Sequence, residues 1–290
     1  MITCRFHGQL GNNLFQLAAL LSLKEQGKEI FLLNSVHRGN IDEINDFKIH
    51  PKELEIKQMF NYKFNFMEVD VFNNFYHDKF KILNHPDLSN NVDFGFNQIN
   101  QEDFTIINGY FQSEKYFISF AKNLKYHYFT PSESVINNIS KKYDLDRFYN
   151  SVSLHYRRGG DRHIGDMQEY FKDLEFEYYR EALSRVESKA EVNRIYVFSD
   201  DIPWCKENQS KLIQSDKEVV FIEGNKNYED LFLMSMCDHN IIANSTFSWW
   251  SAWLNKNDDK IIVAPKTDWF GPKLRHMNLN DLFPNKWITL

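Results

Sequence analysis

The sequence predicts an α/β protein built from two α/β halves, and two observations support this prediction. The first is a strand, a glycine-containing turn, a helix and a second strand at the start of the chain, which together form a βαβ unit. The second is a set of short apolar runs in the later half that alternate with segments of helix length. Such alternation is typical of a parallel sheet covered by helices on both faces.

The opening βαβ unit is read from three consecutive segments. Residues 2–6 (ITCRF) and 29–33 (EIFLL) are the expected strands, and the apolar run LFQLAALLSLKEQ between them is the expected helix. Asn12 or Asn13 is expected to cap the beginning of this helix, and Gly27 stands where a left-handed residue commonly ends one.

The regularity of the pattern changes along the chain. Residues 40–105 are rich in Asn, Asp, Phe and Lys without clear periodicity, so we expect short helices and irregular connections there. After Pro131 the pattern becomes regular, and a domain boundary is expected near this point. The expected domains are residues 1–130 and residues 131–290.

The later half contains five short apolar runs that we interpret as strands. One helix between them is indicated by apolar residues at four-residue spacing, namely Leu174, Tyr178, Ala182 and Val186. The expected strands are residues 151–155 (SVSLH), 194–198 (RIYVF), 219–223 (VVFIE), 240–243 (NIIA) and 260–264 (KIIVA).

Composition narrows the class of protein. The formal net charge of −6 argues against a general nucleic-acid-binding protein, which normally has a basic surface, so no nucleic-acid partner is expected. The three cysteines, Cys4, Cys205 and Cys237, are scattered, which fits a reducing compartment. No signal peptide is evident and no apolar stretch reaches about 18 residues, so we expect a cytoplasmic protein without a transmembrane segment. Peripheral attachment to a membrane remains compatible with the sequence.

The run HYRRGGD, residues 155–161, follows the first strand of the later half. Ligands bind at the carboxyl ends of strands in open α/β sheets. Arg157 and Arg158 offer forked donors, and the two glycines let the backbone approach closely, which suits an anionic group such as a diphosphate. The alternative is a surface turn with solvated arginines.

Two further polar segments follow predicted strands. HGQLGNN places glycines beside a helix N-terminus, where anions are favoured, although it is not the dinucleotide pattern G-x-G-x-x-G. In FSDD, residues 198–201, a carboxylate could accept hydrogen bonds from a ribose or a base edge. Alternatively, Ser199 is only an N-cap, and Asp200 or Asp201 only complements the helix dipole.

The run HNIIANSTFSWWSAWL, residues 239–254, joins a strand to a helix. Ser245 or Thr246 is a natural N-cap, and Asn244, Ser245 and Thr246 together offer polar groups to a phosphate. The three tryptophans that follow lie on one helix face, where core packing is the favoured role.

The sequence does not predict a metal site. Asp144-Leu145-Asp146 is a D-x-D sequence, but it precedes a strand, which favours a solvated loop. The histidines show no H-x-x-x-H pair on a helix, so zinc is not indicated either.

Four segments in combination resemble the α-1,2-fucosyltransferase family, glycosyltransferase family 11. HYRRGGD resembles the family's H-x-R-R-G-D motif, and HNIIANSTFSWWSAWL resembles its most distinctive C-terminal motif. GQLGNNLFQ resembles the N-terminal G-x-x-G-N-x-x-F-Q element, and INGYFQSEKYF, residues 107–117, resembles the middle element. The segments stand in the family order and span nearly the whole chain.

The resemblance implies a GT-B-like fold, with two Rossmann-like α/β domains facing a cleft. It implies an inverting, metal-independent enzyme without a cofactor, which moves fucose from GDP-fucose to the 2-hydroxyl of a terminal galactose on a glycan. The C-terminal domain would bind the nucleotide and the N-terminal domain the acceptor.

The resemblance also implies roles for individual residues. Arg157 and Arg158 would hold the diphosphate and assist the departure of GDP, while Asn12 would reach the donor from the other domain. The implied donor-binding residues are Gly11, Asn12, His155, Arg157, Arg158, Asp200, Asn244, Ser245, Thr246 and Phe247.

The chain departs from the family pattern at two places. R-R-G-G-D carries one more glycine than R-R-G-D, which affects the placement of Asp161, and Ser251 replaces a glycine among the tryptophans. A general base is not evident, and Asp161 and Asp166 are the candidates, with a solvated loop position as the alternative for Asp166. The alternatives left open are an α-1,3 linkage, another GDP-sugar donor, or a carbohydrate-binding protein without catalytic activity.

Overall fold

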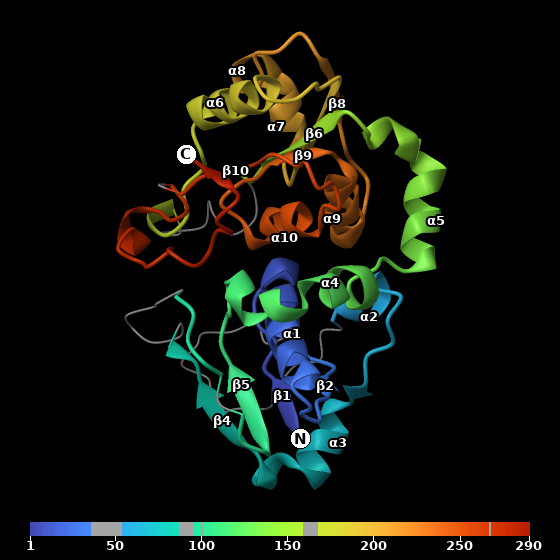
Figure 1. Ribbon diagram of the computed structural model, residues 1–290, viewed down its shortest axis with the longest axis vertical. Coiled ribbons are helices and arrows are strands. Elements are labelled where there is room, and N and C mark those ends of the chain that lie inside the picture. Colours follow the sequence, from blue (N-terminus) through green and yellow to red (C-terminus); the bar gives the residue numbers. More distant parts are fainter. Residues whose placement is uncertain (36–53, 87–94, 100, 159–167, 267) are drawn as a thin grey trace. The chain divides into compact units, whose positions relative to one another are not determined.

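The computed structural model of the chain describes residues 1–35, 54–86, 95–99, 101–158, 168–266 and 268–290. The chain divides into two compact units (Figure 1). Unit 1 comprises Met1–Glu133 and Met277–Pro284, and unit 2 comprises Ser134–His276 and Asn285–Leu290.

The segment Met277–Pro284 differs from the expected division, which gave all of residues 131–290 to the second domain. Its Asp281 carboxylate accepts hydrogen bonds from Lys115 Nζ at 2.6 Å and from the Phe96 amide at 2.8 Å. Leu282 and Phe283 are buried. Unit 1 therefore includes a segment that is distant in sequence.

Unit 1 contains the predicted βαβ unit. Strand β1 (Ile2–Cys4), helix α1 (Leu10–Glu25) and strand β2 (Leu32–Leu33) follow one another as expected, and Ile2 forms a parallel bridge with Ile30. A three-stranded parallel sheet has the order β1-β5-β4, and β2 pairs with β3 in parallel. The other strands are β3 (Phe66–Met67), β4 (Lys81–Asn84) and β5 (Thr105–Asn108).

The expectation of only helices and irregular connections between residues 40 and 105 was wrong at β3 and β4. These strands are two and four residues long and have no fully buried residue, so they lack the apolar alternation that marks a strand. Helices α2 (Ile56–Met59) and α3 (Val69–Phe75) are short, as expected. Residues 36–53, 87–94 and 100 of this stretch lie outside the described residues.

The sequence predicted a capping residue at the beginning of α1 and a left-handed glycine at its end. The N-cap residue is Gln9, without a side-chain cap, so the predicted capping by Asn12 or Asn13 was wrong. Asn13 instead donates to the His7 carbonyl at 3.0 Å. Gly27 adopts the predicted left-handed conformation (φ +87°), and its amide donates to the Lys24 carbonyl at 2.9 Å.

Unit 2 is built on a six-stranded parallel sheet with the order β11-β10-β9-β6-β7-β8. All five predicted strands are present, and β11 is an addition at the C-terminal end. Chain order runs outward from β6 on one side and from β9 on the other, so strand order reverses between these two. The strands are β6 (Ser151–Tyr156), β7 (Arg194–Ser199), β8 (Glu218–Phe221), β9 (His239–Ile241), β10 (Ile262–Ala264) and β11 (Ile288–Thr289).

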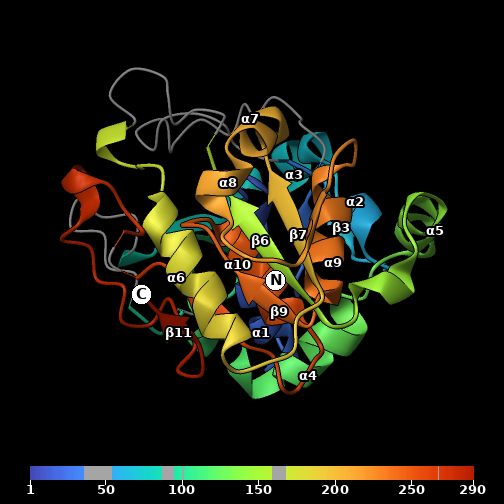
Figure 2. The same cartoon turned by 90° about the horizontal axis from the view of Figure 1, so that it is seen from above.

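Helices cover both faces of this sheet, as predicted (Figures 1 and 2). Val152 and Leu154 pack in a core with residues of α6, α7 and α8, whereas Tyr196 and Phe198 pack in a core with residues of α5 and α9. The helices are α5 (Glu133–Lys142), α6 (Phe176–Glu187), α7 (Ile202–Glu207), α8 (Gln209–Leu212), α9 (Asn227–Met236) and α10 (Thr246–Leu254).

The predicted apolar face of α6 is confirmed at Ala182 and Val186, which are buried. Leu174 precedes the helix, and Tyr179 rather than Tyr178 is among its buried residues. The Tyr178 hydroxyl instead donates to the Ile242 carbonyl at 2.7 Å.

A buried polar network joins β6, β9 and the end of α10. The Asn240 side chain donates to Ser153 Oγ at 2.7 Å and to the Met234 carbonyl at 2.8 Å. The Asn255 side chain donates to Asn240 Oδ1 and to the Cys237 carbonyl, both at 2.8 Å. Buried polar groups that are fully hydrogen-bonded fix one arrangement of the elements that carry them.

The Asp230 carboxyl of α9 gives a pH-dependent prediction. Burial raises its pKa from 3.8 to about 6, against the opposing effect of a hydrogen bond from Asn225 Nδ2 at 2.9 Å. The folded state thus binds the proton more tightly than the unfolded state, so this group makes the protein less stable as pH rises from about 4 to about 6. Asp230→Asn should be more stable than the unmodified protein by about 1–2 kcal/mol above pH 6.

Urea unfolding between pH 4 and pH 7.5 measures this difference. Glu207→Gln, at an exposed position of α7, is the control and should leave the pH profile unchanged. A constant difference between Asp230→Asn and the unmodified protein across this pH range would contradict the assignment.

Candidate functional site

The carboxyl ends of β6 and β9 meet where strand order reverses in unit 2. Ligands of open parallel sheets bind at such a point. Residues 157–158 follow β6, residues 200–201 follow β7, and residues 244–247 follow β9. The structure thus brings three of the predicted motifs to one edge of one sheet.

Two aspartates hold the two arginines at this edge. Asp200 Oδ2 lies 3.2 Å from Arg157 Nη1, and Asp200 Oδ1 accepts the Arg158 backbone amide at 2.9 Å. Asp201 Oδ2 accepts from Arg158 Nε at 3.2 Å. Each side chain is between one fifth and about one third exposed, so these are not fully solvated surface charges. In this structure Asp200 contacts the Arg157 side chain and the Arg158 backbone, and its predicted contact with a ribose or a base edge stays a prediction.

Asp201 also begins the next helix. Its Oδ1 accepts the Trp204 amide of α7 at 3.2 Å, which makes Asp201 the N-cap residue. Ser199 was considered for that role, but its hydroxyl accepts the Asp201 amide at 3.0 Å. One carboxylate therefore fixes both a helix start and an arginine.

Trp204 is a residue of this site that the sequence analysis missed. The Arg158 guanidinium carbon lies 4.3 Å from the centre of the Trp204 ring, a cation–π contact. The ring stacks on Phe176 with centroids 5.6 Å apart, and on Tyr156 at 4.9 Å. One signal in the sequence could have indicated its role: Trp204 is the third residue of the helix that follows the neighbouring strand β7.

The N-terminus of α10 lies at the same edge of the sheet. Ser245 caps the helix, as predicted, because its hydroxyl accepts the Phe247 amide at 3.3 Å. Thr246 is the first helical residue, and the first turn has no acidic side chain. The Phe247 ring lies 5.6 Å from the His155 ring of β6. Backbone amides at a helix start attract anions, so this segment is suited to a phosphate group.

Asn244 is buried, and its amide nitrogen contacts the protein itself. It donates to the carbonyls of Lys172, Asp268 and Trp269 at 3.0, 3.2 and 3.2 Å. These contacts support a role in holding two loops together, whereas the predicted contact of Asn244 with a donor stays a prediction.

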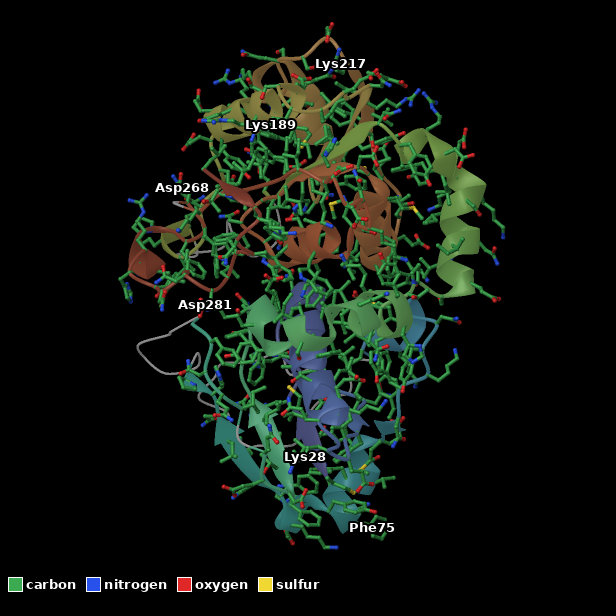
Figure 3. All side chains as sticks on the ribbon, in the orientation of Figure 1. Lys28, Phe75, Lys189, Lys217, Asp268 and Asp281 are labelled. Carbon is green, nitrogen blue, oxygen red and sulfur yellow. The ribbon has the colours of Figure 1, made fainter. Side chains whose placement is uncertain are left out.

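The two loops that Asn244 joins also contact each other directly. Lys172 Nζ lies 3.1 Å from Asp268 Oδ1, and Asp268 is labelled in Figure 3. The Gly271 amide donates to the Tyr170 carbonyl at 2.6 Å, and a Cβ at Gly271 would lie 2.6 Å from the Glu169 carbonyl oxygen. Only glycine permits this approach of the two backbones.

Gly11 and Asn12 belong to unit 1, in the first turn of α1. Asn12 Oδ1 accepts from Gln112 Nε2 at 3.1 Å. Gly8 has φ +80°, and a Cβ there would lie 2.5 Å from Asn12 Nδ2, so a glycine at residue 8 leaves room for this side chain. The predicted donor contacts of Gly11 and Asn12 stay predictions.

Several expectations remain without a structural test. Asp161 and Asp166, the candidate bases, lie outside the described residues. Within the part of the chain that the structure describes, no three His, Cys, Asp or Glu side chains gather as a metal-binding group, and metal independence stays a prediction. None of the helices in the described ranges is long and apolar enough to cross a membrane.

Comparison with known sequences gives a match over the whole chain. The model of glycosyl transferase family 11 matches residues 1–290. An alpha-1,2-colitosyltransferase of Escherichia coli is 36% identical over 63% of this chain and 61% of its own length. The galactoside alpha-(1,2)-fucosyltransferase 1 of Homo sapiens is 27% identical over 44% of this chain and 35% of its own length. The matched regions thus span less than two thirds of these relatives.

Comparison with solved structures identifies the fold. The crystal structure of POFUT1 in complex with GDP-fucose superposes with a TM-score of 0.52 at 13% identity, covering 90% of this chain and 96% of that one. NodZ alpha-1,6-fucosyltransferase co-crystallized with GDP gives a TM-score of 0.51 at 14% identity, covering 86% and 90%. These two comparisons identify the fold as GT-B-like, as predicted.

The contacts of Asn244 predict a specific loss of stability. Asn244→Asp removes the donor and places a carboxylate against carbonyl oxygens, which should cost about 2–3 kcal/mol of folding free energy. Asn257→Asp is the control, because Asn257 is less buried and its side chain donates to one carbonyl, that of Asp238, at 3.2 Å. Asn257→Asp should lower the free energy of unfolding by about 1 kcal/mol or less. Urea unfolding checks both, and equal losses would contradict the anchoring role.

Proposed function

Because the chain belongs to glycosyl transferase family 11, we propose that it transfers fucose from GDP-fucose to the 2-hydroxyl of a terminal galactose on a glycan. The reaction inverts the configuration at the anomeric carbon and uses no metal. The partners are the nucleotide sugar and a galactose-terminated glycan.

One observation carries this proposal: Arg157 and the N-terminus of α10 lie at the point of strand-order reversal in unit 2. A guanidinium and a helix start are both suited to phosphate oxygens. The comparisons support the nucleotide sugar, since POFUT1 was crystallised with GDP-fucose and a human relative is a galactoside alpha-(1,2)-fucosyltransferase.

The proposed reaction is a single displacement. The acceptor hydroxyl oxygen bonds to the anomeric carbon of fucose while the bond from that carbon to the β-phosphate oxygen breaks. The electron pair of the broken bond leaves with GDP, and the hydroxyl proton leaves the acceptor. Negative charge therefore develops on the leaving diphosphate, where Arg157 and the α10 amides would stabilise it. This positive charge is what a metal supplies in other transferases, so the reaction needs none.

Asp200 contributes by orienting Arg157 before the substrate binds. A donor fixed in advance stabilises a developing charge without the cost of reorganisation during the reaction. Asp161 or Asp166 would accept the acceptor proton, and Asn12 of unit 1 would contact the donor.

A second candidate donor is a colitosyl nucleotide, because the Escherichia coli alpha-1,2-colitosyltransferase is 36% identical over 63% of this chain. Incubation with GDP-fucose or a colitosyl donor and a panel of β-galactosides, followed by linkage analysis of the product, distinguishes the candidates. An α-1,2-fucosyl product supports the proposal. An α-1,3 product overturns the linkage, and transfer from the colitosyl donor alone overturns the sugar. Binding of free glycan without any binding of GDP would indicate the third alternative, a carbohydrate-binding protein without catalytic activity.

Removal of the Arg157 guanidinium should abolish most of the activity. Arg157→Ala is expected to lower kcat by about 100- to 1000-fold with the fold retained, because a positioned donor to the leaving group is lost. Arg185→Ala, in an exposed pair with Glu181 on α6, is the control and should be as active as the unmodified protein. Turnover measurements with GDP-fucose test both variants, and near-normal turnover of Arg157→Ala would refute the assignment.

A further inference from the structure

We propose that the two adjacent arginines have different roles: Arg157 contacts the diphosphate, and Arg158 is a positioning residue that holds the segment carrying Arg157. This inference rests on the proposed function for the role of Arg157. The role of Arg158 is argued from the contacts of unit 2 alone.

Three different parts of Arg158 are engaged by the protein. Its guanidinium lies over the Trp204 ring at 4.3 Å, and its Nε donates to Asp201 at 3.2 Å. Its backbone amide donates to Asp200 at 2.9 Å. A residue held by its face, its Nε edge and its backbone is fixed in position before any ligand arrives.

The groups that hold Arg158 are themselves fixed. Trp204 stacks on Phe176, with the ring planes 4° apart, and also on Tyr156, the last residue of β6. Asp201 caps the helix that carries Trp204. The arginine therefore connects the end of β6 to α7, which follows the neighbouring strand.

Asp200 couples the position of Arg158 to that of Arg157, because its carboxylate contacts both residues. One carboxylate oxygen accepts the Arg158 amide, and the other lies 3.2 Å from Arg157 Nη1. If Arg158 leaves the Trp204 ring, the backbone next to Arg157 moves and the geometry at Asp200 changes. A shift of about 1 Å in a group that acts on the transition state lowers a rate by about 100-fold.

The two possible roles of Arg158 predict different results for a lysine. A phosphate ligand is partly replaced by lysine, which keeps a point charge. A stacked, forked contact is not, because lysine has neither the plane nor the Nε donor. Trp204 separates the roles further, because the positioning role requires its aromatic ring and a phosphate ligand does not.

The experiment compares Arg158→Lys, Trp204→Leu, Trp204→Phe and the double variant Arg158→Lys with Trp204→Leu. Arg185→Lys is the matched control. We expect Arg158→Lys and Trp204→Leu each to lower kcat by about 10- to 100-fold, with KM for GDP-fucose changed less than about threefold. The double variant should be no worse than either single variant, because both remove the same contact. Trp204→Phe should recover most of kcat because it keeps a ring.

The salt dependence of the Kd for GDP distinguishes an arginine that contacts the diphosphate from one that only positions the neighbouring backbone. Charged contacts to a ligand weaken with ionic strength. Arg157→Ala should reduce the salt dependence of the Kd for GDP, whereas Arg158→Lys and Trp204→Leu should leave it unchanged. Near-normal kcat of Trp204→Leu, multiplicative losses in the double variant, or a changed salt dependence in Trp204→Leu would overturn the inference.

Unfolding midpoints of the same variants test the contact without any ligand. The losses caused by Arg158→Lys and Trp204→Leu should not add in the double variant, and additive losses would overturn the positioning role. Absence of GDP binding by the unmodified protein would instead overturn the proposed function, which the unfolding data do not test.

Discussion

The pairing of β6 with β9 is the constraint on which unit 2 depends. These strands are the two from which chain order runs in opposite directions, so the connections that follow them diverge to opposite sides of the sheet. The Asn240 amide fixes the pair from within the core through Ser153 of the neighbouring strand. Because the register is set there, the polar segments after both strands begin at the same edge of the sheet. The proposed anion site therefore depends on the topology as much as on the residues that line it.

The charged groups of the candidate site would attract an anion, and their pairing also restrains the arginine side chains. Two arginines next to each other repel, and the two aspartates after β7 compensate for this charge while directing the guanidinium groups. Compensation lowers the net positive charge available to a ligand but removes the need to order long side chains on binding. The N-terminus of α10 adds positive potential without a titratable group, so this part of the attraction does not depend on pH.

Local patterns in the sequence were sufficient for the sheet of unit 2 and for the positions of the arginines, because apolar runs mark buried strands and ligands gather at their carboxyl ends. They failed where the deciding contact is distant in sequence. The buried amide of Asn244 is bound by carbonyls about 24 and 72 residues away, and Trp204 meets Arg158 only through the pairing of β6 with β7. The short strands β3 and β4 have too little buried surface to leave a periodic signal. The N-cap at Gln9 could not be predicted from capping propensity. The Asn13 side chain, a candidate cap, instead donates to the His7 carbonyl in the loop after β1.

The return of residues 277–284 to unit 1 has a consequence for recombination. The chain passes from one unit to the other at three places, after residues 133, 276 and 284. A chimaera with a single crossover after residue 133 would therefore combine a new N-terminal half with a foreign Asp281 and Phe283. Exchange of unit 1 between members of this family thus requires two inserted pieces, because a single fusion leaves part of the core of unit 1 to the other parent.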